Sequence, residues 1–172
     1  MDQDTNSPTK DRLLAAARAC LLRRGYAGTT VRELIAESGT NQASINYHFG
    51  SKEVLLNQAV LDLNGEWGRH LFDAVGGELS ATERWRRVID SIEENRSLWF
   101  VNFEAITLAQ HNETIRQGLA ERGARAREVL AEAFGGDGSR QYALLIGVAA
   151  QWLLDPDTAP SAEAIAGGAA PG

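Results

Sequence analysis

Apolar residues recur at intervals of three and four along most of this chain, the spacing that places them on one face of an α-helix. The alternation of Val, Ile and Thr with polar residues that marks β-strands is scarce, while Ala, Leu, Glu and Arg dominate. With 172 residues, 44% of them hydrophobic, the chain is long enough to bury a core. The pattern therefore predicts an all-α protein.

Capping residues and glycines divide this pattern into helices. The first predicted helix has Ser7 as its N-cap and Pro8 at its first position, and it ends at Gly25. Thr30 and Ser80 are each followed three residues later by a glutamate, which is the pattern of a capping box. The same signals predict helices over residues 30–39, 41–48, 51–76, 80–92, 98–109, 112–135, 139–155 and 161–166.

Composition then excludes several classes of protein. A single cysteine, Cys20, rules out an intramolecular disulfide and a cysteine-based zinc site, and it fits a reducing compartment. No run approaches the roughly 18 apolar residues of a membrane span, and the polar, acidic first residues are unlike a secretory signal. We therefore expect a cytoplasmic protein without a membrane partner.

The sequence contains no pattern typical of catalysis or metal binding. The three histidines, His48, His70 and His111, are scattered, and there is no His-Glu-x-x-His, no Gly-rich phosphate loop and no Gly-x-Ser-x-Gly elbow. Cys20 lies on an apolar helix face, which is typical of an inert buried thiol. We expect no enzyme, no catalytic residue, no metal and no cofactor.

Residues 30–49 have the form of a helix-turn-helix: a capped helix, a glycine break at Gly39, and a second capped helix with Ile45 and Phe49 turned inward. A short helix presented in this way fits the DNA major groove. Amides can read adenine, hydroxyls can donate or accept, and an alanine can touch a thymine methyl. The candidate base-reading residues are Gln42, Ala43, Ser44 and Asn46. Any surface hairpin also turns polar residues outward, so this pattern alone leaves DNA binding open.

The longer segment from Gly25 to Leu56 closely resembles the DNA-binding region of TetR/AcrR-family transcriptional regulators. The resemblance rests on a GY…TTVREL opening, the Gly39 turn, a YHF triplet and a Ser-Lys-Glu-x-Leu start to the next helix. Two positions depart from the family pattern: Ile35 replaces a commoner small residue, and Asn46 stands where many members carry Tyr. The family fold implies a helix-turn-helix domain, here residues 1–56, and a helical effector-binding and dimerisation domain, here residues 57–172.

Charge and resemblance together indicate where phosphates would bind. The net charge of −6 is unevenly spread, because residues 1–60 carry +1 and the remainder −7. The resemblance implies phosphate contacts from Thr30, Arg32, Tyr47, His48 and Lys52. Helix N-termini attract anions in any case, which supports Thr30 and adds Ser51. Core packing of Tyr47 or His48, and pairing of Arg32 with a nearby carboxylate, remain alternatives.

Aromatic residues gather between residues 67 and 111, with polar groups interleaved. A mostly apolar cavity with a few polar groups suits a small, largely apolar ligand, although such aromatics also fill ordinary cores. The segment 98–109 is apolar nearly all round, so we expect it to be a central helix and a wall of the pocket. The candidate effector-pocket residues are Trp67, Leu71, Trp85, Ile89, Trp99, Phe100, Asn102, Phe103 and Thr107.

The resemblance also implies a homodimer formed by two long C-terminal helices from each subunit. The candidates here are residues 113–134 and 139–154, because the tail after Pro156 is too short to supply another long helix. The second candidate has apolar residues on more than one face, as a helix buried in a dimer would. The candidate interface residues are Tyr142, Leu145, Ile146, Ala149, Trp152 and Leu153.

The sequence therefore predicts a homodimeric regulator that binds a palindromic operator, acts as a repressor and is released by a small-molecule effector. Two alternatives stay open. One is a DNA-binding regulator without an effector, in which the aromatics only fill the core. The other is a helical carrier or scaffold that binds no DNA.

Overall fold

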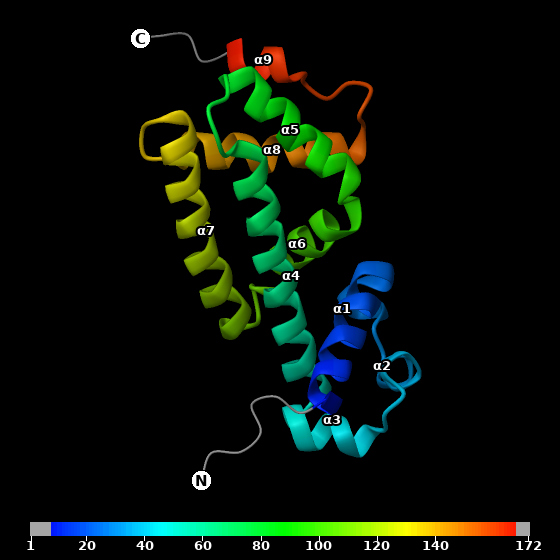
Figure 1. Ribbon diagram of the computed structural model, residues 1–172. Helices are drawn as coiled ribbons and strands as arrows, with labels where there is room; N and C mark the ends of the chain where they lie inside the picture. Colours follow the sequence, from blue (N-terminus) through cyan, green and yellow to red (C-terminus); the bar gives the residue numbers. More distant parts are fainter. Residues whose placement is uncertain (1–7, 168–172) are drawn as a thin grey trace. The chain divides into compact units, whose positions relative to one another are not determined.

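The computed structural model describes residues 8–167, and all regular structure in this range is helical. The first helices are α1 (Pro8–Gly28), α2 (Val31–Ser38), α3 (Gln42–Phe49) and α4 (Lys52–Val75) (Figure 1). They are followed by α5 (Ala81–Glu94), α6 (Arg96–Leu108), α7 (Glu113–Phe134), α8 (Ser139–Leu154) and α9 (Ala162–Gly167). The prediction of an all-α protein is confirmed. Ser7, the predicted first cap, lies outside the described residues.

The chain forms two compact units. Within the described range, the first contains residues 8–64 and 100–119, and the second contains residues 65–99 and 120–167. Helices α4, α6 and α7 each contribute residues to both units. The domain boundary expected at residues 56 and 57 stays a prediction.

The core of the first unit forms where the apolar faces of α1, α2 and α3 meet the first turns of α4. Leu13 of α1, Leu34 of α2, Ile45 of α3, and Leu55 and Leu56 of α4 are all at most 1% exposed. Each such side chain stabilises the fold by about 1.5–3 kcal/mol through removal of apolar surface from water. This burial holds α2 and α3 on one support, so the packing fixes which side of α3 faces solvent.

Most helix starts occur where the sequence predicts them. Side chains of Thr30, Asn41 and Ser80 accept the backbone N–H three residues on, and Thr30 and Glu33 form the full, reciprocal capping box. The expected box at Ser80 is only half formed, because the Glu83 carboxylate pairs with Arg86 at 2.5 Å. An ion pair on the same helix has replaced the return bond to the N-cap backbone.

The first helix differs slightly from the prediction. Gly25 does interrupt it, with φ 70° and ψ −177°, but a further helical turn continues to Gly28. The Thr29 hydroxyl donates to the Gly25 carbonyl at 2.7 Å, which closes this turn against the kink. The extra turn places Tyr26 at the end of α1, where both its backbone and its hydroxyl find partners on other helices.

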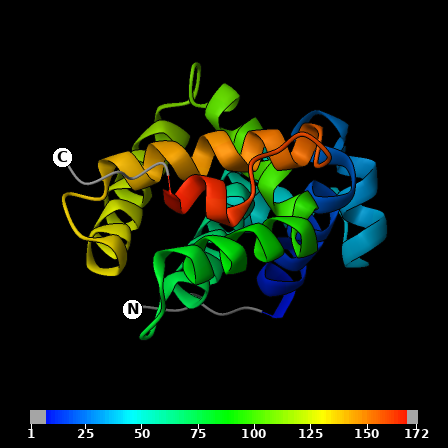
Figure 2. The same ribbon diagram turned by 90° about the horizontal axis from the view of Figure 1, so that it is seen from above.

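The second unit contains the end of α4, α5, the start of α6, most of α7, α8 and α9. Both ribbon views show α9 running beside α5 and α8 (Figures 1 and 2). Arg86 of α5 pairs with Glu163 of α9 at 2.7 Å, and the Trp152 indole N–H donates to the Pro160 carbonyl at 3.1 Å. Arg96 donates to the carbonyls of Trp152 and Leu153 and so caps the end of α8.

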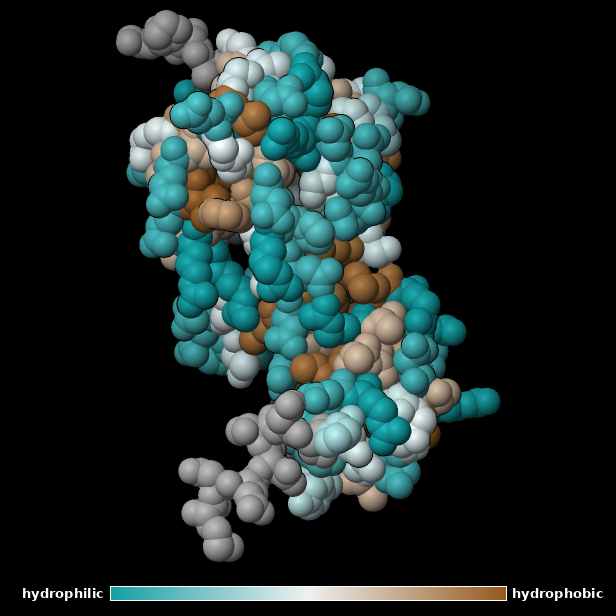
Figure 3. Space-filling model, viewed as in Figure 1, coloured by the Kyte–Doolittle hydropathy of each residue, from teal (hydrophilic) through white to brown (hydrophobic). Residues whose placement is uncertain are grey.

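The surface of the molecule is mainly polar on the face seen in Figure 3, where hydrophilic residues cover the outer side of α7 and brown patches are small. Over residues 8–167, no helix has the length and apolar character needed to cross a membrane. The larger exposed apolar side chains are few, and two of them, Leu144 and Leu154, lie on α8.

Candidate nucleic-acid interface

The turn between α2 and α3 is tight and fully capped. Gly39 adopts a left-handed conformation, with φ 63° and ψ 27°, and its N–H donates to the Ile35 carbonyl at 3.0 Å. Two residues later the Asn41 side chain accepts from the Ser44 N–H at 2.9 Å and starts α3. Because glycine populates this conformation without steric cost, the chain can reverse direction within three residues. The predicted helix-turn-helix geometry is therefore present.

Helix α3 has one buried and one exposed face. Ile45 and Phe49 are 1% and 8% exposed, and they anchor the helix to the first unit. Three of the candidate base-reading residues, Gln42, Ala43 and Asn46, are exposed on the other side. The fourth, Ser44, is half-buried, and its hydroxyl donates to the Asn41 side chain at 3.2 Å, so its role in the structure is to support the cap.

Two of the candidate phosphate-binding residues lie next to α3's exposed face. Tyr47 is 79% exposed, and its ring packs edge-on against the ring of His48, with centroids 4.9 Å apart. His48 is half-buried. The alternative of core packing is thus not realised for Tyr47 in this structure, whereas His48 contributes to local packing as well as to the surface.

The start of α2 carries two more candidates, Thr30 and Arg32. The Thr30 N–H and hydroxyl both donate to Glu33, at 2.9 and 3.0 Å, and the N–H bond holds the pKa of this carboxyl below its ordinary value. Arg24 pairs with the same carboxylate at 3.0 Å. Arg32 is exposed on α2. A phosphate at this helix start would be attracted by the Arg32 guanidinium and repelled by the Glu33 carboxylate.

The start of α4 lies beside the start of α2. The Lys52 ammonium group donates to the Thr29 carbonyl at 3.3 Å, one residue before the Thr30 cap. The Ser51 hydroxyl accepts from the Val54 N–H at 3.2 Å and caps α4. The tertiary structure thus places Lys52, at the start of α4, beside the residue that precedes the Thr30 cap, and phosphate binding by Thr30, Ser51 and Lys52 stays a prediction.

Sequence reasoning missed a polar cluster at the end of α1. The Tyr26 N–H donates to the Glu104 carboxylate of α6 at 2.8 Å, and the Tyr26 hydroxyl donates to the Asn57 side chain of α4 at 3.0 Å. Burial raises the pKa of Tyr26. The only signal in the sequence was the Gly-Tyr pair, which does not say which partners Tyr26 will find.

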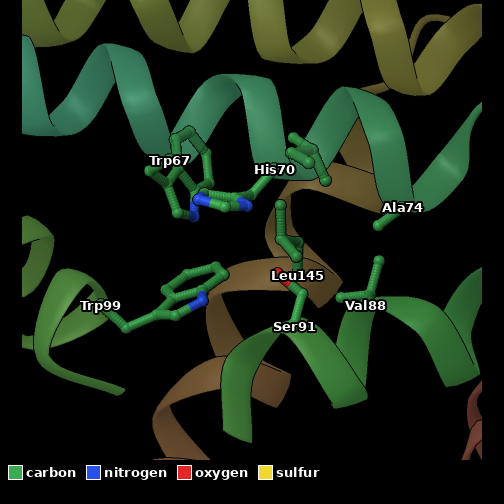
Figure 4. Close-up of a pocket in the computed structure, with 8 residues that line it drawn as sticks. Trp67, His70, Ala74, Val88, Ser91, Trp99 and Leu145 are labelled. Atoms are coloured by element: carbon green, nitrogen blue, oxygen red, sulfur yellow. The ribbon is translucent and has the colours of Figure 1, made fainter. Parts of the chain in front are cut away.

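The second unit contains a small cavity among four helices (Figure 4). Its volume is about 10 Å³, room for about one water molecule. Three of its lining residues, Trp67, Leu71 and Trp99, are among the predicted pocket residues. The complete lining is Trp67, His70, Leu71, Ala74, Val88, Ser91, Trp99 and Leu145.

The other predicted pocket residues lie elsewhere. Trp85 and Ile89 are buried, and the Trp85 ring packs against Phe134 with centroids 5.5 Å apart. Phe100 and Thr107 are exposed on α6, Phe103 is half-buried, and Asn102 accepts a hydrogen bond from Asn64. Helix α6 is therefore not enclosed on all sides in this chain, because Phe100 and Ile106 are 49% and 54% exposed. His70 and Ser91 line the cavity but were not predicted.

The predicted dimer residues also divide into two sets. Leu145, Ala149 and Leu153 are at most 5% exposed and pack inside their own unit, while Tyr142, Ile146 and Trp152 are half-buried. The outer side of α8 instead borders an open groove of about 490 Å³ with α9. Its walls are Arg140, Ala143, Leu144, Gly147, Val148, Gln151, Pro160, Ala164 and Ile165.

We next consider metal-binding clusters within residues 8–167 and the single cysteine. No cluster of three or more His, Cys, Asp or Glu side chains in this range could hold a metal ion. Cys20 is buried on α1, and burial raises the pKa of its thiol. A thiol kept in its neutral form is a poor nucleophile, so Cys20 has a packing role.

A capped helix-turn-helix that follows a first helix in an all-helical fold is an arrangement found in many DNA-binding proteins. Residues 13–59 match the family model described as bacterial regulatory proteins, tetR family. The N-terminal region of the chain is therefore similar to the TetR family, and the resemblance on which the sequence prediction rests is confirmed.

A relative of known function is similar in the same N-terminal region. The chain is 43% identical over 54 residues to the HTH-type transcriptional repressor AcnR of Corynebacterium glutamicum, a match that covers 31% of this chain and 28% of AcnR. The chain thus matches less than a third of that relative's length.

The fold itself is shared over almost the whole chain. The multidrug binding protein EbrR complexed with imidazole is 21% identical, with a TM-score of 0.74 over 90% of this chain and 89% of EbrR. A protein from Saccharomonospora viridis in complex with choline is 23% identical, with a TM-score of 0.73 over 95% of this chain and 94% of its own.

Proposed function

We propose that this protein is a transcriptional repressor that binds a palindromic DNA operator as a homodimer and is released by a small-molecule effector. The observation that carries the proposal is the exposed face of α3, where Gln42, Ala43 and Asn46 stand free of the core while Ile45 and Phe49 anchor the helix. A rigidly held helix with amide side chains outward suits reading of adenine in the major groove.

The charged and polar groups around α3 suit the DNA backbone. Tyr47 is available at the side of the helix, and Arg32, Ser51 and Lys52 lie at the starts of α2 and α4. Contacts of this kind fix the position of a protein on DNA, while contacts to bases select the sequence. The +1 balance of residues 1–60 is low for a DNA-binding region, so binding should depend strongly on these few groups.

Dimerisation is assigned to the outer side of α8 and to α9. Leu144 and Leu154 are 37% and 81% exposed, and apart from Arg140 and Gln151 the groove between α8 and α9 is lined by small or apolar residues. Exposed apolar surface of this kind is typical of protein interfaces. This assignment moves the interface from the buried residues Leu145, Ala149 and Leu153 to their exposed neighbours on the same helix.

Two facts support effector-controlled repression. AcnR, which shares the N-terminal region, is a transcriptional repressor, and two proteins with this fold were crystallised with imidazole and choline. The cavity beside Trp67 and Trp99 is the candidate effector site in this chain. An effector that binds one conformation of the dimer better than the other would shift the population away from the DNA-binding form.

Gel retardation on the DNA that flanks the protein's own gene tests this proposal. We expect salt-sensitive retardation of one fragment in the presence of excess random DNA. Retardation of every fragment alike would contradict operator recognition. Absence of retardation at all salt concentrations tested would favour the alternative of a helical carrier or scaffold.

A further inference from the structure

The cavity of the second unit contains a hydrogen-bond donor with no partner. The Trp67 side chain is 5% exposed, and its indole N–H makes no hydrogen bond within residues 8–167. Figure 4 shows the indole pointing from α4 toward Trp99, with its nitrogen at the end that faces the cavity. A buried N–H without an acceptor is unfavourable, so an acceptor at this position would be bound favourably.

The rest of the lining defines what kind of molecule could supply that acceptor. Leu71, Ala74, Val88 and Leu145 are apolar, and the rings of Trp67 and Trp99 meet edge to face with centroids 5.4 Å apart. Such walls suit a flat, apolar body. Ser91 and His70 add two groups that can donate or accept.

Charge excludes a cation from this position. None of the eight lining residues is a carboxylate, and the unpartnered group is a donor that would point its hydrogen at the positive charge. A buried cation without a countercharge is strongly unfavourable. An anion would also lack a fixed countercharge, since neither Lys nor Arg lines the cavity. The site therefore suits a neutral molecule.

One wall of the cavity is less firmly packed than the others. The side chain of His70 is 40% exposed and lies 4.0 Å from Glu66 on the solvent side of α4, whereas Trp67 and Trp99 are 5% and 4% exposed. The cavity of about 10 Å³ must enlarge to admit anything bigger than water. Rotation of an exposed side chain is the least costly way to enlarge it, so His70 is the movable wall.

We propose that this cavity is the effector site and that it selects a neutral, flat, apolar molecule with one hydrogen-bond acceptor, which takes the Trp67 indole N–H and enters past His70. That the bound molecule acts as an effector rests on the proposed regulatory function, whereas the selectivity of the cavity does not. Binding to the free protein can be measured without DNA, so failure of one proposal is distinguishable from failure of the other.

Three molecules of nearly equal shape separate the possible chemistries. Pyridine is neutral at pH 8 and carries one acceptor, benzene carries none, and N-methylpyridinium carries a fixed positive charge. Each is titrated into the full-length protein labelled with ¹⁵N while the tryptophan indole N–H signals are recorded. The Trp67 signal is assigned as the one lost in Trp67→Phe, and Trp152, whose indole N–H is bonded to Pro160, is an internal reference.

We expect pyridine to move the Trp67 signal downfield in a saturable manner and to leave the Trp152 signal in place. Trp67→Phe keeps an aromatic side chain but removes the indole N–H, so its affinity for pyridine should fall about 2- to 10-fold relative to its affinity for benzene, the effect of one net hydrogen bond. Phe72→Leu, which changes an exposed aromatic residue of the same helix, should bind pyridine like the unmodified protein.

Three results would overturn the proposal. The first is a Trp67 signal that exchanges magnetisation with water and responds to none of the probes, because the donor would then serve a buried water molecule only. The second is equal or tighter binding of N-methylpyridinium. The third is equal loss of pyridine and benzene binding in Trp67→Phe, which would show a packing role without selection of an acceptor.

Discussion

Asn46 and Gln42 are the residues on which sequence-selective binding depends in our proposal. Asn46→Ala or Gln42→Ala should cost about 1–3 kcal/mol of operator affinity, because a bidentate amide contact to adenine discriminates by that amount. Both side chains are exposed, so their removal should leave the stability of the protein nearly unchanged. Titration of operator and random DNA, followed by fluorescence anisotropy, measures the effect. Equal losses on both DNAs would refute base reading.

Lys52 serves as the matched contrast. Its ammonium group lies between the starts of α2 and α4, where it would neutralise a phosphate and read no base. Lys52→Ala should therefore weaken binding to operator and random DNA alike, and it should lower the salt dependence by about one unit of slope. A selective loss on the operator alone would show that Lys52 does not act through the backbone.

Gly25 shows how a single residue shapes the link between α1 and α6. It has φ 70°, and a Cβ placed on it would lie 3.0 Å from the Glu104 carboxylate that accepts from Tyr26. Gly25→Ala should therefore lower the free energy of unfolding by about 1–3 kcal/mol, the cost of a positive-φ backbone conformation that is nearly restricted to glycine.

Gly65 provides the control for this change. It lies inside α4, where an added Cβ meets nothing within 4 Å, so Gly65→Ala should raise the free energy of unfolding by about 0.5–1 kcal/mol. Urea unfolding of the two variants should thus shift in opposite directions. A Gly25→Ala variant as stable as Gly65→Ala would mean that the kink at Gly25 is not required.

The capping box at the start of α2 predicts a pH dependence. The Thr30 N–H lowers the pKa of Glu33, so the charged form of this carboxyl is favoured by folding. Its contribution is complete above the ordinary Glu pKa of about 4.3 and is lost as pH falls through the lower value in the folded protein.

Glu33→Gln keeps the acceptor but removes the charge. The unmodified protein should therefore resist urea better than Glu33→Gln at pH 7, and the difference should disappear as the pH falls below about 4. Glu128→Gln, an exposed change within α7, should show no comparable dependence. A stability difference that persists unchanged at low pH would contradict an electrostatic role for Glu33.

Individual helices were predicted well because their signals are local. Thr30, Asn41 and Gly39 fix where α2 and α3 begin and end, and each acts on backbone groups within four residues. The exception is α6, which was expected to be central because it is apolar nearly all round. Phe100 and Ile106 are exposed, since packing of a helix depends on how many neighbours surround it and not on its own composition alone.

At the scale of the whole molecule, the exposed side of α8 predicts the effect of a charge on assembly. Leu144→Glu would place a carboxylate in the groove between α8 and α9, and a buried unpaired charge is unfavourable in a dimer interface. We expect monomers that bind the operator far more weakly, because one helix-turn-helix domain contacts only half of the operator. Light scattering at micromolar concentration measures the mass.

Phe72→Glu is the control for assembly, because it charges an apolar side chain that is 57% exposed and lies outside this groove. It should remain dimeric. Ala149→Glu would be a poor test, since Ala149 is fully buried in its own unit and its replacement would disrupt the fold. A mass equal to one chain for the unmodified protein would refute the proposed interface.

The sequence by itself determined the helical class, most helix boundaries, the family of the N-terminal region and the buried face of α3. These features depend on residues close together in the chain, such as Asn41 with Ser44 and Ile45 with Phe49, so a local pattern is sufficient to predict them.

Only the tertiary structure decided which distant residues meet. It joined Lys52 to the Thr29 carbonyl and Tyr26 to Glu104. It turned Leu145 inward while leaving Leu144 exposed, and it placed His70 and Ser91 in the lining of the same cavity as Trp67. Each of these contacts depends on the packing of helices far apart in sequence. A helical period shows that a side chain is on an apolar face, but the neighbouring helices determine whether that face becomes core, cavity or interface.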